Sequence, residues 1–351
     1  MSLYENVFRV LEAKIASGEL SPGAKLPDEH SLAKQFKVHR LTVRKALAKL
    51  QKNGRLVRYR RRGTFVAKAH PASLSIVYIG DMESHLHKDI FIALANETNE
   101  AGSRLTGISP HAEKAADYLQ PRISAEIAAG SWLIVSTDAF ATVRPFLPSS
   151  FRRLLLLGRW PQKHETPCYA VILDVERAVT SAIDYLFALG HRRIALLTTG
   201  SEGVADENKP YAAAYRYALA RRGLAKEEHF ILIAGGDGNA EDLKRVEDFL
   251  RNRCGVTAVV CDGDFRARLC YDVCRQQNSS IPGDISLIGI GDTPWCDLFT
   301  PPLASVNFGV SEAARLAVAL CARGEPRESL QCYVAPRVVA RNSVAQPHAG
   351  E

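Results

Sequence analysis

A row of basic side chains lies on one face of the helix that the stretch VHRLTVRKALAKLQKNG, residues 38–54, predicts. At 100° per residue, that face contains Leu41, Arg44, Lys45, Lys49 and Lys52, with Arg40 at its leading end. No acidic residue of the stretch lies there, so ion pairs within the helix do not account for the face. Guanidinium groups one turn apart can donate paired hydrogen bonds to phosphates or to guanine edges. The pattern therefore predicts a surface that binds a polyanion.

The opposite side of this helix is apolar, at the spacing of a helix that packs inward. It carries Val43, Ala46, Leu47 and Leu50. Two more helices are expected before it, one starting at Ser2 and one capped by Asp28, separated by the turn SPGAKLP. Two strands, 56–59 and 64–67, are expected after it, joined by the loop of residues 60–63. Three helices and a basic hairpin predict a winged helix-turn-helix.

Charge is distributed unevenly along the 351 residues. Residues 1–70 hold 16 Lys and Arg against 5 Asp and Glu, a net charge of +11, whereas the remainder holds 29 against 33, a net charge of −4. A basic head on a slightly acidic body indicates that only the head meets a polyanion. We therefore expect a head at residues 1–68, a linker at 69–75 and a core at 76–345.

The head resembles the DNA-binding domain of the GntR family of bacterial regulators. The resemblance rests on GELSPGAKLPDEHSLAKQFKVHRLTVRKALAKLQKNG and GTFVA, which hold the PG-x-x-LP turn, the R-x-T-V-R-x-AL-x-x-L helix and the GTFV wing. It implies that the third helix enters the major groove of double-stranded DNA. The residues that it assigns to DNA are His30, His39, Arg40, Leu41, Thr42, Arg44, Lys45, Arg62 and Gly63.

Three of these positions leave alternatives open. His30 stands where family members often have Arg or Lys, and His39 where they often have Ser or Thr, which makes their contacts weaker or dependent on pH. Leu41 suits a thymine methyl group or is a tolerated surface leucine. Lys45, like Lys49, is expected to neutralise phosphate rather than to distinguish bases.

After the linker, apolar runs alternate with amphipathic helices. The runs are SIVYIGD, SWLIVST, RLLLLGR, YAVILD, RRIALLTTG, HFILIAG, TAVVCDGD and DISLIGIGD. This alternation predicts an α/β core of doubly wound parallel sheets in two lobes. The motifs GHRRIALL and IPGDISLIGIGD resemble the sensor core of LacI/GalR-type repressors, which has the fold of periplasmic binding proteins. That resemblance implies three crossings between the lobes, near 172–174, 304–307 and 335–338.

The same resemblance implies a ligand cleft at the strand ends, with a hinge that closes on an effector. The candidate effector-binding residues are Asp81, Arg159, Trp160, Asp174, Tyr211, Asp264, Asp292 and Trp295. Each tryptophan could stack on a ligand or pack at the cleft rim or dimer interface, and Asp292 could cap a loop instead. Tyr211 stands where the family has an Arg, and Gly263-Asp264 where it has Asn-Asp. Either the effector is not a simple sugar, or other residues have replaced the lost contacts.

Several function classes find little support. The eight cysteines include no CxxC pair; Cys270 and Cys274 could hold a metal, but buried small hydrophobes account for them better. We expect no metal and no cofactor. No G-x-S-x-G, P-loop or H-E-x-x-H motif indicates an enzyme. The charged N-terminus and the lack of a long apolar run indicate a cytoplasmic protein, associated with the nucleoid and not with a membrane.

These observations favour a DNA-binding transcription regulator that is not an enzyme. We expect a repressor that binds a palindromic operator as a homodimer and responds to a small-molecule effector such as a sugar or a sugar derivative. The alternative is a regulator whose core has lost effector sensing and only dimerises. An enzyme is a remote alternative.

Overall fold

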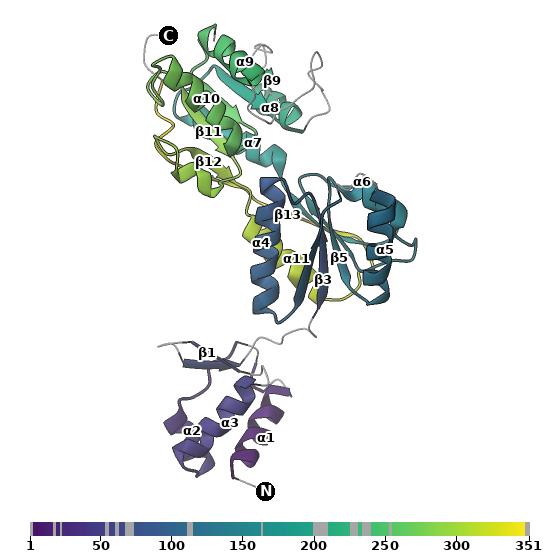
Figure 1. The fold of residues 1–351 in the computed structure, drawn as a ribbon. Helices are drawn as coiled ribbons and strands as arrows, with labels where there is room; N and C mark the ends of the chain where they lie inside the picture. Colours follow the sequence, from purple (N-terminus) through teal and green to yellow (C-terminus); the bar gives the residue numbers. More distant parts are fainter. Residues whose placement is uncertain are drawn as a thin grey trace. The chain divides into compact units, whose positions relative to one another are not determined.

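The computed structural model describes residues 3–16, 19–21, 23–52, 56–59, 63–66, 74–110, 115–162, 164–198, 210–224, 231–233, 240–252 and 255–347. The chain divides into two compact units, Met1–Leu74 with Glu100–Ser103 and the remainder. Figure 1 labels their helices and strands. No helix among the described residues is both long and apolar enough to cross a membrane.

The head is a winged helix-turn-helix. It contains α1 (Leu3–Ala16), α2 (Glu29–Phe36), α3 (Arg40–Lys52), β1 (Leu56–Tyr59) and β2 (Gly63–Val66). The two strands pair antiparallel, with Tyr59 opposite Gly63, so the second strand begins one residue earlier than the sequence predicts. The Asp28 carboxylate accepts hydrogen bonds from the backbone N–H groups of His30 and Ser31, which confirms it as the N-cap of α2. Ser2, residues 67–68 of the head and residues 69–73 of the predicted linker lie outside the described residues.

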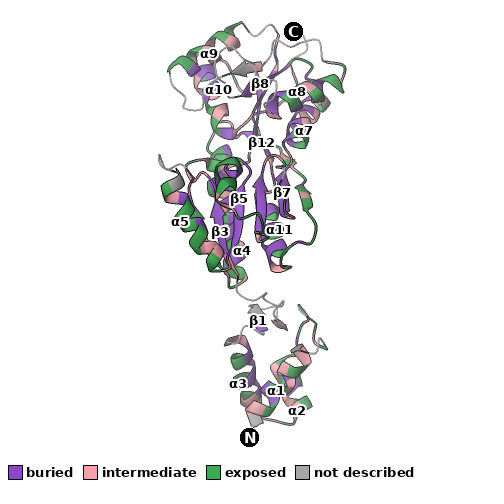
Figure 2. Cartoon of the chain, turned by 90° about the vertical axis from the view of Figure 1, so that its right-hand side faces the viewer, coloured by how far each residue is buried: buried purple, intermediate pink, exposed green. Residues whose placement is uncertain are grey.

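The apolar side of α3 forms the middle of the head core. Val43, Ala46 and Leu50 are fully buried and Leu47 nearly so, which confirms the predicted inward face. They pack against residues of α1, α2 and β1, namely Val7, Phe8, Leu11, Leu26, Leu32 and Leu56. Figure 2 shows the buried residues of the molecule in purple. Because one side of α3 is fixed in this core, its opposite side must face outward.

The first lobe of the core is built on a six-stranded parallel sheet of order β13-β7-β6-β5-β3-β4. Its strands are β3 (Ser75–Ile79), β4 (Arg104–Ile108), β5 (Trp132–Ser136), β6 (Leu154–Gly158), β7 (Tyr169–Leu173) and β13 (Leu330–Val334). Its helices are α4 (His85–Glu100), α5 (Ala115–Ala128), α6 (Phe140–Val143), the 3-10 turn η1 (Arg144–Phe146) and α11 (Val310–Ala322). Helices α5 and α6 pack on one face, and α4 and α11 lie on the other (Figure 1).

The second lobe holds a six-stranded sheet of order β14-β12-β11-β10-β8-β9, in which only β14 runs antiparallel. Its strands are β8 (Ile194–Thr198), β9 (Ile231–Ile233), β10 (Ala258–Cys261), β11 (Ser286–Ile290), β12 (Ala304–Asn307) and β14 (Arg337–Val339). Its helices are α7 (Val175–Ala188), α8 (Pro210–Ala220), α9 (Ala240–Arg251), α10 (Asp264–Gln276) and the 3-10 turn η3 (Pro294–Asp297). Two such doubly wound lobes give the α/β, periplasmic-binding-protein-like architecture expected from the sequence.

The chain passes between the lobes at three places. It leaves β7 for α7 at Asp174, leaves β12 for α11 at residues 308–309, and leaves β13 for β14 at residues 335–336. The second crossing therefore lies just after the predicted range 304–307. Gly309 adopts φ 75° there, and a Cβ on it would lie 2.7 Å from Val334 in the adjacent crossing. Only glycine meets both conditions without strain.

Candidate functional site

The outward side of α3 carries the side chains predicted to contact DNA. Leu41 is 57% exposed, and Arg40, Arg44 and Lys45 are also exposed. Thr42 is half-buried at the edge of this face. An exposed leucine among cations fits contact with a thymine methyl group. We call the surface formed by Arg40, Leu41, Arg44 and Lys45 the basic face.

Glu29 of α2 holds both arginines of the basic face. The Arg40 Nε lies 2.9 Å from Glu29 Oε2, and the Arg44 Nη2 lies 3.2 Å from the same oxygen. The hydrogen bond from Arg44, together with that from Arg40, lowers the pKa of Glu29 below its ordinary value. The sequence of α3 alone gave no hint of this carboxylate, because it comes from the preceding helix. It fixes the direction of two long side chains that would otherwise be free.

The other predicted head residues have different surroundings. The Nδ1 of His39 accepts a hydrogen bond of 3.3 Å from the Leu41 backbone N–H, so His39 caps α3. His30 lies exposed in the first turn of α2. Lys49 lies over the Phe8 ring at 4.7 Å, which gives it a contact within the head rather than a free charge. Gly63 begins β2, and Arg62 lies outside the described residues.

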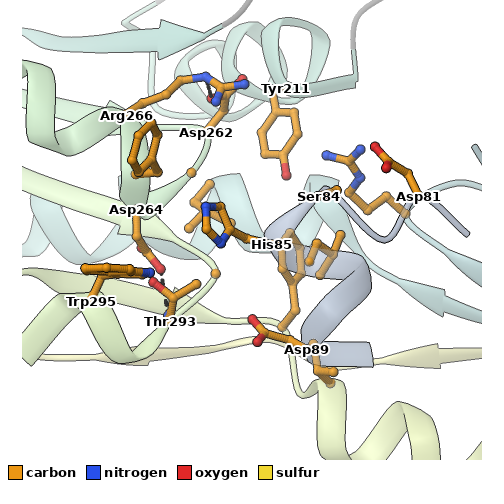
Figure 3. Close-up of a pocket in the computed structure, with 18 of the residues that line it drawn as sticks. Asp81, Ser84, His85, Asp89, Tyr211, Asp262, Asp264, Arg266, Thr293 and Trp295 are labelled. Atoms are coloured by element: carbon orange, nitrogen blue, oxygen red, sulfur yellow. Dashed lines mark hydrogen bonds and ion pairs between the residues drawn. The ribbon is translucent and has the colours of Figure 1, made fainter. Parts of the chain in front are cut away.

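The core contains a cavity of about 600 Å³ at the carboxyl ends of both sheets. Figure 3 shows side chains from the two lobes converging on it. Five of the predicted effector residues line it: Asp81, Arg159, Tyr211, Asp264 and Trp295. Other lining residues include Glu83, Ser84, His85, Asp89, Asp262, Phe265, Arg266 and Thr293. Ligands of open α/β sheets commonly bind at this end of the strands.

Arg159 enters the cavity from the end of β6, held by a carboxylate of its own lobe. Its Nη2 lies 3.2 Å from Asp138 Oδ2, and the Nε2 of buried His87 lies 3.1 Å from the same oxygen. Burial raises the pKa of Asp138, but the His87 hydrogen bond and the Arg159 charge outweigh it and hold that pKa below its ordinary value. Arg159 also contacts the hydroxyl of Tyr211, which belongs to the second lobe. The guanidinium thus joins the lobes.

The second lobe holds its own acidic residues in place. Arg266 Nε lies 2.6 Å from Oδ1 of Asp262, which directly follows β10, and Thr198 donates to Asp262 Oδ2 at 2.5 Å. Asp264 is buried, with its oxygens accepting from the Thr293 N–H at 2.7 Å and the Ser305 hydroxyl at 2.5 Å. These bonds fix the Asp264 carboxylate at the wall of the cavity. Its charge has no Lys or Arg partner among the described residues.

Aromatic rings and a second carboxylate complete the cavity. The rings of His85 and Phe265, from opposite lobes, lie 5.8 Å apart. Trp295 is 51% exposed at the edge of the cavity. Burial raises the pKa of Asp89, and the nearby charge of Asp264 adds to that rise, whereas His85 acts against it. The negative charges of Asp89 and Asp264 therefore repel each other.

Three predicted effector residues do not line this cavity. Asp174 accepts a hydrogen bond of 2.9 Å from the Arg177 N–H and caps α7 instead. Asp292 is paired with Arg341 at 2.9 Å and accepts from Asn307 at 2.8 Å, so it braces the loop after β11. Trp160 packs against the Arg159 guanidinium at 4.6 Å. Their neighbours in the fold, not their strand-end positions, decide where these three side chains lie, and their role in effector binding stays a prediction.

Sequence reasoning also missed residues that the fold brings to the cavity. Ser84 directly precedes α4, His85 and Asp89 lie on its first two turns, and Phe265 and Arg266 lie on the first turn of α10. One available signal was their position directly after a buried strand, where parallel sheets place binding residues. No cluster of three or more potential metal ligands occurs in the part of the chain that the structure describes. Cys270 and Cys274 are buried in the core of the second lobe.

Comparisons with known proteins agree with this architecture. Residues 3–66 match the bacterial regulatory proteins of the gntR family, and residues 183–344 match the periplasmic binding protein-like domain. The arabinose metabolism transcriptional repressor of Geobacillus stearothermophilus is 28% identical over 351 residues, covering 95% of this chain and 94% of that protein.

Solved structures show the same core fold. The Escherichia coli transcriptional repressor ascG matches with a TM-score of 0.61 at 19% identity, over 78% of this chain and 100% of that one. A LacI family transcriptional regulator from Enterococcus faecium, solved with bound ribose, matches with a TM-score of 0.62 at 17% identity, over 78% and 100% of the two chains. This chain therefore joins a winged-helix head that matches the gntR family of bacterial regulatory proteins to a core that matches the periplasmic binding protein-like domain and shares the fold of the solved LacI family regulators.

Proposed function

We propose that this protein is a transcription repressor that binds a palindromic DNA operator as a homodimer and is controlled by a small effector in the cavity of its core. It acts in the cytoplasm, at the nucleoid, and is not an enzyme. The observation that carries the proposal is the basic face of α3, because a face with two oriented arginines and one exposed leucine has the chemistry of major-groove recognition.

The DNA-binding part rests on the division of roles within α3. Its apolar side is committed to the head core, which leaves Arg40 and Arg44 outward at 59% and 53% exposure. Each guanidinium can offer two donors to a guanine or a phosphate. Lys45 is assigned to phosphates, and Arg62 and Gly63 of the wing are assigned to a close approach to the minor groove. A homodimer would present two such heads to two half-sites.

The effector part rests on the cavity. Its volume of about 600 Å³ fits a small organic molecule, and its polar and aromatic lining suits a ligand with hydroxyl groups and an apolar ring face. One structural relative was solved with bound ribose, and the name of a full-length relative refers to arabinose metabolism. We therefore propose a carbohydrate-like effector. Its binding would change the angle between the lobes and thereby the affinity for the operator.

A core that only dimerises is the second candidate. It is favoured by the pairing of both cavity guanidinium groups inside the protein, Arg159 with Asp138 and Arg266 with Asp262. A guanidinium that is already paired offers less to the hydroxyl groups of a ligand. The two candidates differ only in whether the cavity binds anything.

The DNA-binding proposal is tested by selecting operators from random double-stranded DNA and measuring affinity by fluorescence anisotropy. We expect a palindromic consensus, a dimer by sedimentation, and affinity that falls steeply with salt because several phosphates are neutralised. Equal affinity for the consensus and for scrambled DNA would contradict sequence-specific repression.

The effector proposal is tested by thermal unfolding against pentoses, hexoses, uronic acids, sugar phosphates and nucleosides. A ligand at 100 times its Kd stabilises the folded state by about 2.7 kcal/mol, which is a visible shift in Tm. A ligand that shifts Tm should also change operator affinity. A protein that binds its operator but ignores every compound would favour the core that only dimerises.

A further inference from the structure

The guanidinium groups of the cavity bring little net positive charge to a ligand. Arg159 is paired with Asp138, and Arg266 with Asp262, so each cation has a carboxylate at 3.2 Å or less. Opposite charges at such short range cancel much of each other's field at the distance of a bound molecule. The remaining charged side chains therefore decide which ligand charge the cavity accepts.

Two of these remaining side chains are carboxylates that line the cavity from opposite lobes. Asp89 lies on α4 of the first lobe and Asp264 on α10 of the second, and both line the cavity. Neither has an ion pair with Lys or Arg among the residues described. The Asp264 charge is close enough to raise the pKa of Asp89. Bringing the lobes together therefore brings two negative charges together, which costs free energy.

The wall around these carboxylates is aromatic. Trp295, 51% exposed, and Phe265, 37% exposed, both line the same cavity. The Arg268 guanidinium lies over the Phe265 ring at 5.5 Å, so Trp295 is the ring proposed to meet a ligand cation. Figure 3 shows Trp295 beside Asp264, with His85 and Asp89 nearby. Exposed rings next to uncompensated carboxylates are the surroundings in which proteins bind organic ammonium groups, because the ring face attracts cations. The rings are independent of the carboxylates and point to the same class of ligand.

We propose that the effector is a small organic cation, a protonated amine on a polar body such as an aminosugar, whose ammonium group lies between Asp89 and Asp264. This inference rests on the proposed function, because it assumes that the cavity binds an effector. The ammonium group neutralises the two carboxylates and removes the repulsion between the lobes. Closure then depends on the charge of the ligand. An anionic ligand such as a sugar phosphate meets Glu83, Asp89 and Asp264 and is disfavoured.

The test is a matched set of hexoses that differ in charge. Glucosamine, N-acetylglucosamine, glucose, glucuronate and glucose 6-phosphate are titrated into the full-length protein at about pH 7, where the amino group of glucosamine is mostly protonated. Binding is followed by Tm and by calorimetry. We expect glucosamine to bind about tenfold more tightly than N-acetylglucosamine, since a hydrogen bond between charged groups is stronger than a neutral one. The two anionic sugars should show no binding.

The variants Asp89→Asn and Asp248→Asn locate the effect. Asp248 is exposed on α9 of the second lobe and does not line the cavity, so its variant should retain the tenfold preference. Asp89→Asn should lose the preference for glucosamine. An anionic sugar that binds as tightly as glucosamine would overturn the inference and leave the proposed function standing. If the protein still binds its operator but binds none of these sugars, the proposed effector sensing fails, and this inference fails with it. A preference that survives Asp89→Asn would also overturn it.

Discussion

Arginines form ion pairs with carboxylates in both the head and the core, but the number of arginines per carboxylate differs. In the head, Arg40 and Arg44 share the single carboxylate of Glu29 and remain 59% and 53% exposed. In the core, Arg159 and Arg266 each have an aspartate of their own and are only 26% and 22% exposed. The head arginines thus keep a net positive charge, whereas the core arginines do not.

This difference separates two uses of the same side chain. Two guanidinium groups oriented by one carboxylate can still attract a polyanion, and the carboxylate limits the directions in which they point. A guanidinium that has a carboxylate to itself mainly holds neighbouring side chains in place, as Arg159 does between Asp138 and Tyr211. The comparison predicts that removing a carboxylate destabilises the core but changes selectivity in the head.

The largest effect is expected for Asp138→Ala. The change leaves Arg159 without its ion pair and buried His87 without its partner, so the free energy of unfolding should fall by about 2–4 kcal/mol. Urea unfolding at neutral pH measures it. Because the pKa of Asp138 is lowered in the folded state, its stabilisation is present above the ordinary value of 3.8 and is lost as the pH falls below it.

The matched control for Asp138 is Glu165→Ala, which removes an exposed ion pair with Arg144. These side chains are 81% and 52% exposed, so the loss should stay below about 0.5 kcal/mol. Equal losses in the two variants would remove the distinction between core and surface pairs.

Arg44→Ala should weaken operator binding by about 1–3 kcal/mol, roughly ten- to a hundredfold, if Arg44 contacts a base edge. Anisotropy titrations with operator and scrambled DNA measure it. The control Arg327→Ala removes one exposed positive charge from the core and should leave both affinities unchanged. A loss that is equal for operator and scrambled DNA would assign Arg44 to phosphate.

Glu29→Gln should raise the affinity for scrambled DNA by about three- to tenfold, because a negative charge next to the basic face is lost. The ratio of the affinity for the operator to the affinity for scrambled DNA should fall, because Arg40 and Arg44 both lose the carboxylate that orients them. Glu19→Gln, which alters an exposed pair with Lys14, is the control. An unchanged preference would mean that α3 alone orients Arg40 and Arg44.

The smallest effect is expected for Asp89→Asn in the absence of ligand. The pKa of Asp89 is raised in the folded state, so folding is favoured with the protonated form and this advantage is lost as the pH rises above the ordinary value of 3.8. The variant should therefore be more stable at neutral pH, by no more than about 1 kcal/mol. The gain should vanish near pH 3, and Asp248→Asn should show none. A loss of stability at neutral pH would contradict repulsion at Asp89.

The sequence by itself determined the regular parts of this protein. The 3.6-residue period of α3 assigned Val43 and Leu50 to the core and Arg40 and Arg44 to the surface, because neighbouring turns of one helix fix both faces. The continuous apolar runs predicted eight strands, most of them central and buried. Strands β4, β12, β13 and β14 were not predicted from such runs. β4, β13 and β14 lie at sheet edges, where exposure leaves no continuous apolar run. β12 is buried inside its sheet, but its four residues, ASVN, include Ser305 and Asn307 and so form no apolar run.

Only the tertiary structure decided which side chains meet. Glu29 reaches Arg44 from another helix, and Asp138 reaches Arg159 from the end of a neighbouring strand. The cavity joins residues as far apart in the chain as Asp81 and Trp295. Patterns within a helix or strand depend on residues a few positions apart, whereas these pairs depend on strand order and on three crossings between lobes. A strand-end position placed Asp264 in the cavity, but it could not tell that Asp174 caps α7 instead.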